Sequence, residues 1–195
     1  MIHNHDRSGW FGASDTSTIM GNWATETFRK WWLEKLGLRE NRFHTPAMQA
    51  GTAYEHRILE RICVLKMDRQ IRIPRLRLRV NYDGEFPRTI IEVKTHSKPG
   101  FKVSKAYWQQ CQVEMFASGY GFWRKRKTCY IVAYQLTDAE MQNYFLPVDS
   151  RRLSHHEVRY DAQWVRDAYL PRLRYLAKCL KTGHWPRMEE LYGAG

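Results

Sequence analysis

The stretch LRLRVNYDGEFPRTIIEVKT, residues 76–95, decides the fold of this chain. Its first half alternates apolar with charged or polar residues, which is the period of a β-strand with one buried and one exposed face. Residues 83–87 read DGEFP and supply turn formers, and residues 89–95 return to β-branched side chains. We therefore predict a β-hairpin near the centre of the sequence.

This hairpin would gather three charged side chains. Glu92 and Lys94 are two positions apart, so both project from one face of the returning strand, and Asp83 ends the strand before it. Two carboxylates suit an oxygen-preferring Mg²⁺ ion, and a neighbouring ammonium stabilises developing charge, as phosphodiester hydrolysis requires. The alternative is an ordinary surface pair on a strand, because a Glu-x-Lys pattern is common.

The rest of the chain predicts helices and further strands around the hairpin. Apolar residues recur with helical spacing on both sides of it, and Pro171 predicts a kink in the last helix. The predicted helices are 14–37, 46–66, 104–118 and 161–181, and the predicted strands are 128–135 and 144–148. Since no repeat or linker divides the sequence, we predict one mixed α/β (α+β) domain over residues 1–195, with a central mixed β-sheet flanked by helices.

A carboxylate interrupts the apolar stripe of the second predicted helix. Spacings of three and four residues place Glu55 on one face with Met48, Gly51, Ile58 and Ile62. A buried carboxylate is costly unless a cation or hydrogen bonds compensate it. Glu55 therefore either forms a structural salt bridge with an arginine or faces the site at Asp83, Glu92 and Lys94.

Two glutamines present a similar choice. Gln110 and Gln112 lie in the predicted helix 104–118, whose buried side carries Tyr107, Cys111 and Met115. A glutamine near that side either positions water or phosphate, or hydrogen-bonds a backbone group. The sequence favours neither role over the other.

The net charge points to an anionic partner. Lys and Arg number 32 and Asp and Glu number 20, which gives a formal net charge of +12. This excess favours nucleic acid over a membrane surface, because the basic residues are not confined to one helix face. A basic, solvated surface without a partner is the alternative. No apolar run approaches the ~18 residues of a membrane helix, so we expect a soluble, intracellular protein without a membrane partner.

The cysteines do not suggest a metal centre. They form no C-x-x-C pair, and each lies in an apolar stretch: Cys63, Cys111, Cys129 and Cys179. We expect four reduced thiols in the core.

Five short blocks, taken together, resemble the motifs of the phage lambda exonuclease family of viral recombinase nucleases. In chain order they are RSGWFGASD (7–15), GTAYE (51–55), NYDG (81–84), EVK (92–94) and YWQQCQ (107–112). The resemblance covers about positions 7 to 119 and implies a restriction-endonuclease-like core of the PD-(D/E)xK superfamily. The chain departs from the pattern where Tyr82 replaces the motif proline and Asn81 replaces a serine that often precedes it.

The resemblance also implies roles for individual residues. Asp83, Glu92 and Lys94 match the catalytic core, with Glu55 and Gln110 beside it. A Mg²⁺ site, with Mn²⁺ as a substitute and two ions in all, is implied at Asp83, Glu92 and the Val93 carbonyl. Arg7 and Ser14 match residues at the terminal 5′-phosphate, and Asn81 can donate to phosphate.

Further basic residues are candidates for DNA contacts. Arg75, Arg77 and Arg79 share the parity of Asp83, so in a regular strand they would line a phosphate approach to it. The alternative is a solvated edge strand protected by charge. The run Arg124–Lys127, beside Trp123, either contacts the DNA backbone or is a polar loop.

These implications describe a Mg²⁺-dependent 5′-to-3′ exonuclease on linear double-stranded DNA. Its 3′ single-stranded tails would serve phage-type recombination beside a single-strand annealing protein. Enzymes of this type form homo-oligomeric rings such as trimers, and the expected location is the cytoplasm of the bacterial host of a phage or prophage. The rivals are a structure-specific or nicking endonuclease with the same core and a DNA-binding module without catalysis.

Overall fold

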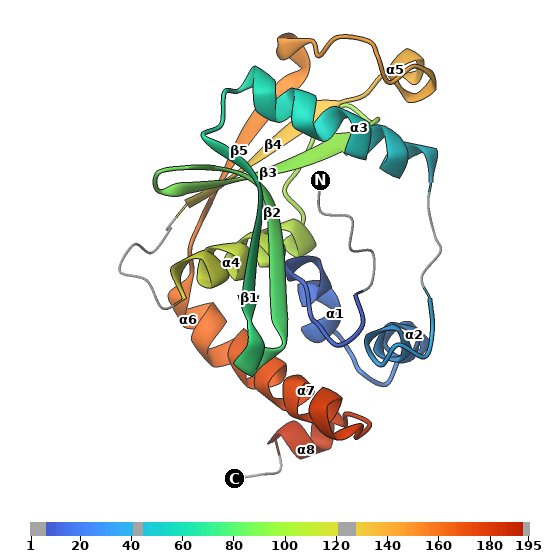
Figure 1. Ribbon diagram of the computed structural model, residues 1–195, viewed down its shortest axis with the longest axis vertical. Helices are drawn as coiled ribbons and strands as arrows, with labels where there is room; N and C mark the ends of the chain where they lie inside the picture. The colour runs from blue at the N-terminus through green and yellow to red at the C-terminus, as the bar shows by residue number, and fades with distance from the viewer. Residues whose placement is uncertain (1–6, 41–44, 121–127, 193–195) are drawn as a thin grey trace.

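The computed structural model describes residues 7–40, 45–120 and 128–192. Five strands form one mixed sheet in the order β1-β2-β3-β4-β5 (Figure 1). β1 pairs with β2, β2 with β3 and β4 with β5 in antiparallel fashion, and β3 pairs with β4 in parallel. The strand bounds are β1 Lys66–Ile73, β2 Leu78–Phe86, β3 Thr89–His96, β4 Thr128–Gln135 and β5 Leu153–Arg159.

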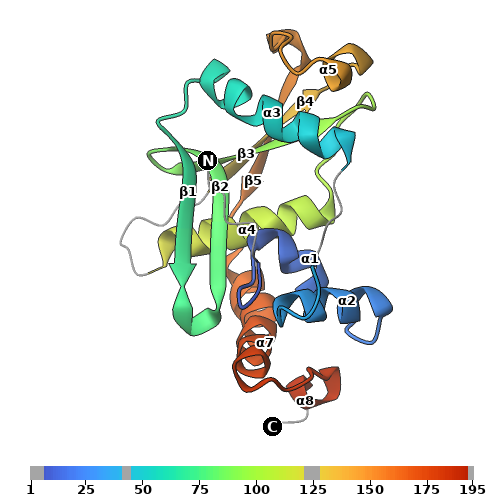
Figure 2. The ribbon, with the colours of Figure 1, turned by 45° about the vertical axis from the view of Figure 1, so that its right-hand side comes forward.

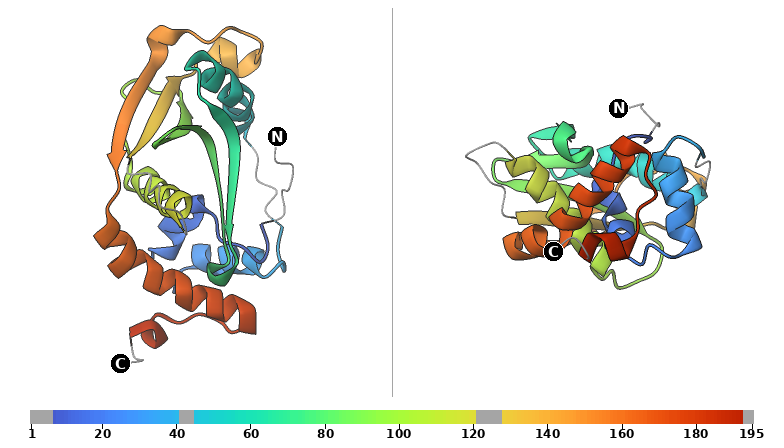
Figure 3. Two further views of the ribbon diagram at one scale, coloured as in Figure 1. Left: turned by 60° about the vertical axis from the view of Figure 1, so that its left-hand side comes forward. Right: turned by 90° about the horizontal axis from the view of Figure 1, so that it is seen from below.

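Helices cover both faces of the sheet, which confirms the predicted fold class. α3 lies over one face, whereas α4 lies on the other, together with α1, α2 and α7 (Figures 1 and 2). α3 and α7 lie toward opposite ends of the long axis of the molecule, as Figures 1 and 2 and the left view of Figure 3 show. The helices are α1 Thr16–Ile19, α2 Glu26–Lys35, α3 Pro46–Arg61, α4 Lys105–Gly119, α5 Asp138–Gln142, α6 Ala162–Trp164, α7 Leu170–Thr182 and α8 Met188–Tyr192.

Each face of the sheet carries its own apolar cluster, because strand side chains alternate between the two faces. Ile91 and Val93 of β3 pack under α3, with Tyr54 and Ile58 of that helix. Ile90 of the same strand packs on the α4 side, in a cluster that includes Phe11, Trp32, Cys111 and Leu173. β3 is thus the buried strand between the two layers.

The predicted helix 46–66 is too long by five residues. α3 ends at Arg61, Cys63 adopts a left-handed conformation with φ 55°, and the chain then enters β1, an edge strand that was not predicted. Leu65 is therefore 64% exposed, and Met48, also expected on the buried face, is 50% exposed. Cys63 is exposed too, whereas the other three thiols are buried as expected.

Two other predicted elements differ from the structure. The predicted helix 14–37 is divided into the 3₁₀ turn η1 (Ala13–Asp15), α1 and α2, and α2 starts anew where Thr25 accepts a hydrogen bond from the Phe28 amide. Residues 144–148 are not a strand. Their carbonyls instead accept hydrogen bonds from α3, Tyr144 from Arg57 and Leu146 from the Tyr54 hydroxyl. The fifth strand is β5, further along the chain.

The last long helix is continuous from 162 to 182, as predicted, with a widened turn before Pro171. Residues Val165–Tyr169 form the π-helical turn η4, which links α6 to α7. A proline cannot donate to the residue four positions earlier and clashes with its carbonyl, so a wider turn accommodates Pro171. Gly183 ends the helix in a left-handed conformation. None of the helices in the described part of the chain has the length and apolar character needed to cross a bilayer.

Candidate active site

The predicted hairpin opens at its acidic residues. β2 and β3 pair only between Gly84–Phe86 and Thr89–Ile91, and the next pair in register would be Asp83 with Glu92. At that point a side chain replaces the backbone as the hydrogen-bond acceptor: Asp83 Oδ2 accepts a hydrogen bond from the Val93 amide at 2.7 Å. β3 continues to pair with β4 as far as His96, so only the β2 side of the strand is freed. Asp83 and Glu92 therefore lie where β2 and β3 separate.

Glu92 is the centre of the predicted catalytic group. Glu92 Oε1 accepts hydrogen bonds from Lys94 Nζ at 2.6 Å and from Gln110 Nε2 at 2.5 Å. Only 4% of Glu92 is exposed, and its other oxygen, Oε2, is buried without a hydrogen-bond partner among the described residues. Natural proteins rarely leave a buried carboxylate oxygen unsatisfied. A cation at this oxygen would compensate it.

Glu55 approaches the same group from the opposite layer. α3 lies close to β3 at Gly51, where an added Cβ would be 2.9 Å from Thr95 Oγ1, and Glu55 follows one helical turn later. No arginine forms an ion pair with Glu55 within the described ranges. Instead, the ligand atoms of Glu55, His56 and Asp68 all lie within 4.8 Å of one another. Glu55 and Lys94 line one cavity, so Glu55 lies near the predicted site, and its role there stays a prediction.

The carboxylates of Asp83, Glu92 and Glu55 lie close enough for their negative charges to repel one another. Burial, followed by the charges of Glu92 and Glu55, raises the pKa of Asp83 well above its ordinary value. The pKa of Glu55 is raised as well, by burial and by Glu92. Burial lowers the pKa of Lys94, but the adjacent Glu92 outweighs it and the net shift is upward, so Lys94 is an ammonium at neutral pH. The oxygen donors and their mutual repulsion fit a divalent cation such as Mg²⁺.

A cavity of about 270 Å³ joins the catalytic group to the N-terminal segment. The segment reaches it through two backbone hydrogen bonds with the start of β2, from Phe11 N to Arg77 O at 2.7 Å and from Arg79 N to Phe11 O at 2.8 Å. The structure thereby brings together eight of the predicted site residues around this cavity: Asp83, Glu92, Lys94, Gln110, Arg7, Ser14, Arg79 and Asn81.

A second cavity of about 600 Å³ lies on the α3 side of the same group. Glu55, Gly51 and Thr95 border it, and Lys94 borders both cavities. The catalytic group therefore stands between two open spaces rather than at the end of one.

Two predicted phosphate contacts do not lie where the parity argument placed them. Arg75 belongs to the 3₁₀ turn η2 (Pro74–Leu76), and Arg77 has a left-handed backbone with φ 49°. The regular strand begins only at Leu78, so the shared face predicted from parity is wrong for both arginines. The predicted shared face is present at Arg79 and Asn81, which line the smaller cavity together with Asp83. The run Arg124–Lys127 lies outside the described residues.

The two glutamines have different partners, and Gln112 has the predicted hydrogen bonds to backbone groups. Gln110 bonds to Glu92, whereas Gln112 donates to the Arg159 carbonyl at 2.8 Å and accepts from the Asp161 amide at 2.7 Å. Gln112 thus ties α4 to the chain between β5 and α6. Only Gln110 belongs to the site.

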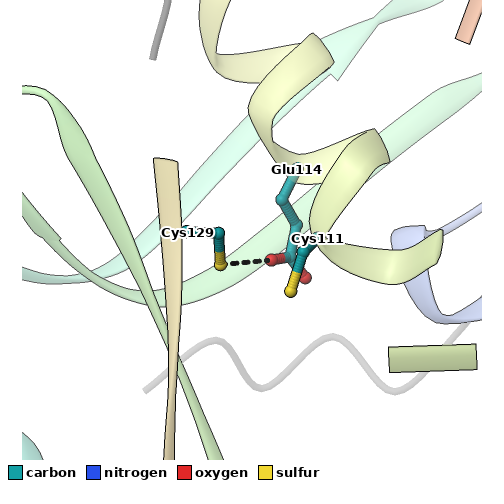
Figure 4. A group of neighbouring side chains, drawn as sticks. All are labelled: Cys111, Glu114 and Cys129. Carbon is teal, nitrogen blue, oxygen red and sulfur yellow. Dashed lines mark hydrogen bonds between the residues drawn. The ribbon is translucent and has the colours of Figure 1, made fainter. Parts of the chain in front are cut away.

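Glu114 is part of the site region and was not predicted. It is fully buried on α4, and its Oε1 accepts a hydrogen bond from Gln110 Nε2 at 2.8 Å. Its Oε2 lies 4.0 Å from Cys129 Sγ, with Cys111 alongside (Figure 4). Burial and the charge of Glu92 raise its pKa well above the ordinary value, which favours the neutral acid. The i, i+4 spacing of Gln110 and Glu114 is the sequence signal that could have revealed this pair.

Asp15 and Lys35 were also missed. They form a buried ion pair of 2.5 Å that connects η1 to α2, and Lys35 lines the smaller cavity. Their separation of twenty residues in the chain gave no local signal.

Comparison with solved structures places the chain in an exonuclease-like fold. The alkaline exonuclease LHK-Exo of Laribacter hongkongensis superposes with a TM-score of 0.62 and 20% identity, over 91% of this chain and 94% of that one. A phage-related exonuclease from Haemophilus somnus 129PT gives a TM-score of 0.65 and 15% identity, over 89% and 96% of the two chains. No protein-family model and no curated protein matches. At these identities the likeness establishes the fold.

Proposed function

We propose that this protein is a divalent-metal-dependent DNA exonuclease that degrades one strand of linear double-stranded DNA from its 5′ end. The observation that carries the proposal is the 270 Å³ cavity, where the paired carboxylates and Lys94 face a cationic, hydroxyl-bearing wall. The carboxylates and Lys94 suit hydrolysis of a scissile phosphate, and the cationic wall suits a terminal phosphate. The exonuclease fold of the structural neighbours and the net charge of +12 support the same conclusion.

The catalytic residues divide the chemistry between them. Asp83 and Glu92, with the carbonyl of Val93, would hold Mg²⁺ or Mn²⁺, singly or as a pair. A metal bound there would activate water and neutralise charge on the scissile phosphate. Lys94, whose ammonium is hydrogen-bonded to Glu92, would orient the attacking water or stabilise developing charge. Gln110 fixes the orientation of Glu92.

The proposed 5′-to-3′ polarity rests on the resemblance, in which Arg7 and Ser14 match residues at the terminal 5′-phosphate. An arginine can hold a terminal phosphate through two parallel charge-assisted hydrogen bonds. A terminal phosphate also carries more negative charge than an internal diester. Asn81 and Arg79 on the same wall would contact the adjacent phosphate, whereas Arg75 and Arg77, at the turn before β2, would contact DNA outside the cavity.

The wider role would be the production of 3′ single-stranded tails for phage-type recombination. A single-strand annealing protein would take up these tails. A ring-shaped homo-oligomer such as a trimer would keep the enzyme on its DNA, within the cytoplasm of the bacterial host.

The test uses three DNA substrates with Mg²⁺: 5′-phosphorylated linear duplex, 5′-hydroxyl linear duplex and closed circular duplex. We expect faster digestion of the phosphorylated ends, survival of the circle, and loss of the phosphate preference in Arg7→Ala. Arg29→Ala is the matched control, because Arg29 lies on the exposed surface of α2. Cleavage of circles as fast as linear DNA would establish the endonuclease rival. Binding without Mg²⁺-dependent cleavage would establish the DNA-binding module.

A further inference from the structure

A buried carboxylate organises the wall of the smaller cavity, and the proposed function gives it no role. Asp15 accepts three hydrogen bonds: from the Gly12 amide at 2.7 Å, from Trp31 Nε1 at 2.9 Å and from Lys35 Nζ at 2.5 Å. The three donors come from the N-terminal loop and from two successive turns of α2. Asp15 therefore fixes the loop that carries Ser14 against that helix.

Lys35 is unusual for a lysine because it is only 3% exposed. An ammonium has three protons to donate, and the described residues supply one hydrogen-bond acceptor, Asp15 Oδ2. The ring of Trp31, 5.5 Å away, gives a further cation–π contact. Donors left unsatisfied at a buried charge are costly. Lys35 lines the cavity, so an anion bound there could accept the remaining protons.

The loop leaves space for such an anion beside Ser14. Gly12 lines the cavity, and a Cβ added to it would lie 3.6 Å from Asp15 Oδ2, 3.7 Å from Ser14 Oγ and 3.8 Å from the Arg79 carbonyl oxygen. These are ordinary contact distances, so the absent methyl group is not needed to avoid a clash. A methyl group would instead take up room between Ser14 and the cavity.

We propose that Lys35 binds the 5′-terminal phosphate monoester of the DNA strand, and that Asp15 is the positioning residue that holds Lys35 and Ser14 for it. The inference rests on the proposed function and deepens it, because a monoester dianion carries one charge more than an internal diester. Arg7 on the exposed rim and Lys35 on the buried wall would approach this phosphate from different directions. The competing explanation is an ion pair that only fastens η1 to α2.

The experiment measures the ratio of kcat/KM on 5′-phosphorylated duplex to that on 5′-hydroxyl duplex. A structural defect lowers both rates alike and leaves the ratio unchanged, whereas loss of a phosphate contact lowers the ratio. For Lys35→Gln we expect the ratio to fall roughly tenfold or more, the size of one charge-assisted hydrogen bond. Lys35→Arg should restore part of it. Lys30→Gln, an exposed lysine on the same helix, is the matched control and should leave it unchanged.

A second variant guards against unfolding. Lys35→Gln leaves the Asp15 carboxylate buried without its cation, so the double substitution Asp15→Asn with Lys35→Met removes both charges together. We expect it to keep a melting temperature close to that of the wild type and to lose the phosphate preference, so that its ratio of kcat/KM values approaches one. Inorganic phosphate should raise the melting temperature of the wild type above that in sodium chloride of equal ionic strength, and the double variant should lose this rise.

The outcomes separate the two proposals. If the wild type prefers phosphorylated ends and the folded Lys35 variants keep the same ratio, the pair only fastens η1 to α2 and this inference fails while the exonuclease stands. If the wild type cuts linear DNA from its ends without any phosphate preference, terminal-phosphate recognition fails as a whole. If closed circles are cut equally fast, the proposed function itself fails.

Discussion

Two buried glutamates of this protein, Glu92 and Glu140, show how differently one fold can treat the same side chain. Every oxygen of Glu140 is bonded: Arg152 donates to both, Tyr134 donates to Oε1, and the amide and hydroxyl of Thr137 donate to Oε2. These partners outweigh burial and lower the pKa of Glu140 to about 2. Within the described residues, Glu92 has two donors on one oxygen and none on the other, and acidic side chains surround it.

The difference in hydrogen bonding between Glu92 and Glu140 indicates different roles for the two carboxylates. A carboxylate whose hydrogen bonds are all made within the protein stabilises the fold and has nothing left to offer a ligand. A carboxylate with a buried free oxygen, beside groups whose pKa values are raised, holds unfavourable energy that a bound cation relieves. The comparison therefore predicts opposite responses at the two sites, and four experiments test it.

The largest effect is expected for Asp83→Asn. The amide can still accept the hydrogen bond from the Val93 amide, so the hairpin should keep its shape. The loss of a metal-binding oxygen should lower single-turnover cleavage by about 10³-fold or more, while DNA affinity stays close to wild type. Asp167→Asn is the control, because Asp167 is an exposed residue paired with the exposed Arg166. Near-native cleavage by the folded Asp83 variant would contradict the assignment.

Glu140→Gln should lower the stability of the protein and leave its cleavage rate unchanged. The substitution breaks the buried ion pair with Arg152, which keeps only its longer contact with Asp149 at 3.7 Å among the ion pairs of the described residues. We expect a loss of about 2–4 kcal/mol in the free energy of unfolding. Cleavage by the folded fraction should be unchanged. Glu157→Gln, which breaks the exposed pair with Arg159, should cost less than about 1 kcal/mol in denaturant titrations. Equal losses in the two variants would remove the distinction between the sites.

Mg²⁺ should stabilise the wild type and not the Asp83→Asn variant. Binding to the native state alone adds about 2.7 kcal/mol at a ligand concentration of 100 times Kd, and less at lower saturation. Thermal melting with Mg²⁺ and with a chelator measures this directly. The Glu140→Gln variant should keep the full Mg²⁺ response from its lower starting stability. A Mg²⁺ response that survives Asp83→Asn would place the ion elsewhere.

The smallest effect is expected in the pH dependence of stability, and it becomes visible only in acid. The folded-state pKa of Glu140 is depressed from 4.5 to about 2, so its contribution is complete above about pH 4.5 and is lost as the pH falls toward 2. The difference in unfolding free energy between wild type and Glu140→Gln should therefore narrow over that interval. Urea titrations between pH 5 and pH 2.5 would measure it. A constant difference would mean that the ion pair does not titrate.

The local chemistry of the fold was predictable, and the path of the chain between motifs was less so. α4 starts where the predicted helix 104–118 does, with Ser104 as its N-cap, and the hairpin follows from its alternation. β1 was missed because its short alternating run directly follows a helix whose apolar spacing extends past Arg61. β5 was missed because its residues are mostly polar, as an edge strand tolerates. Pairing with a neighbour, rather than local preference, makes both of them strands.

The sequence by itself determined the residue types of the candidate site, since two carboxylates and a lysine at hairpin spacing predict metal-assisted phosphate chemistry where the fold brings them together. It also determined the alternation that puts Glu92 and Lys94 on one face. Only the tertiary structure decided that the hairpin opens at Asp83, that α3 approaches closely enough at Gly51 to bring in Glu55, and that Asp15 meets Lys35. The physical reason is that these contacts join residues far apart in the chain. Their energies depend on burial and on the acceptors that each neighbour leaves free, neither of which a local pattern contains.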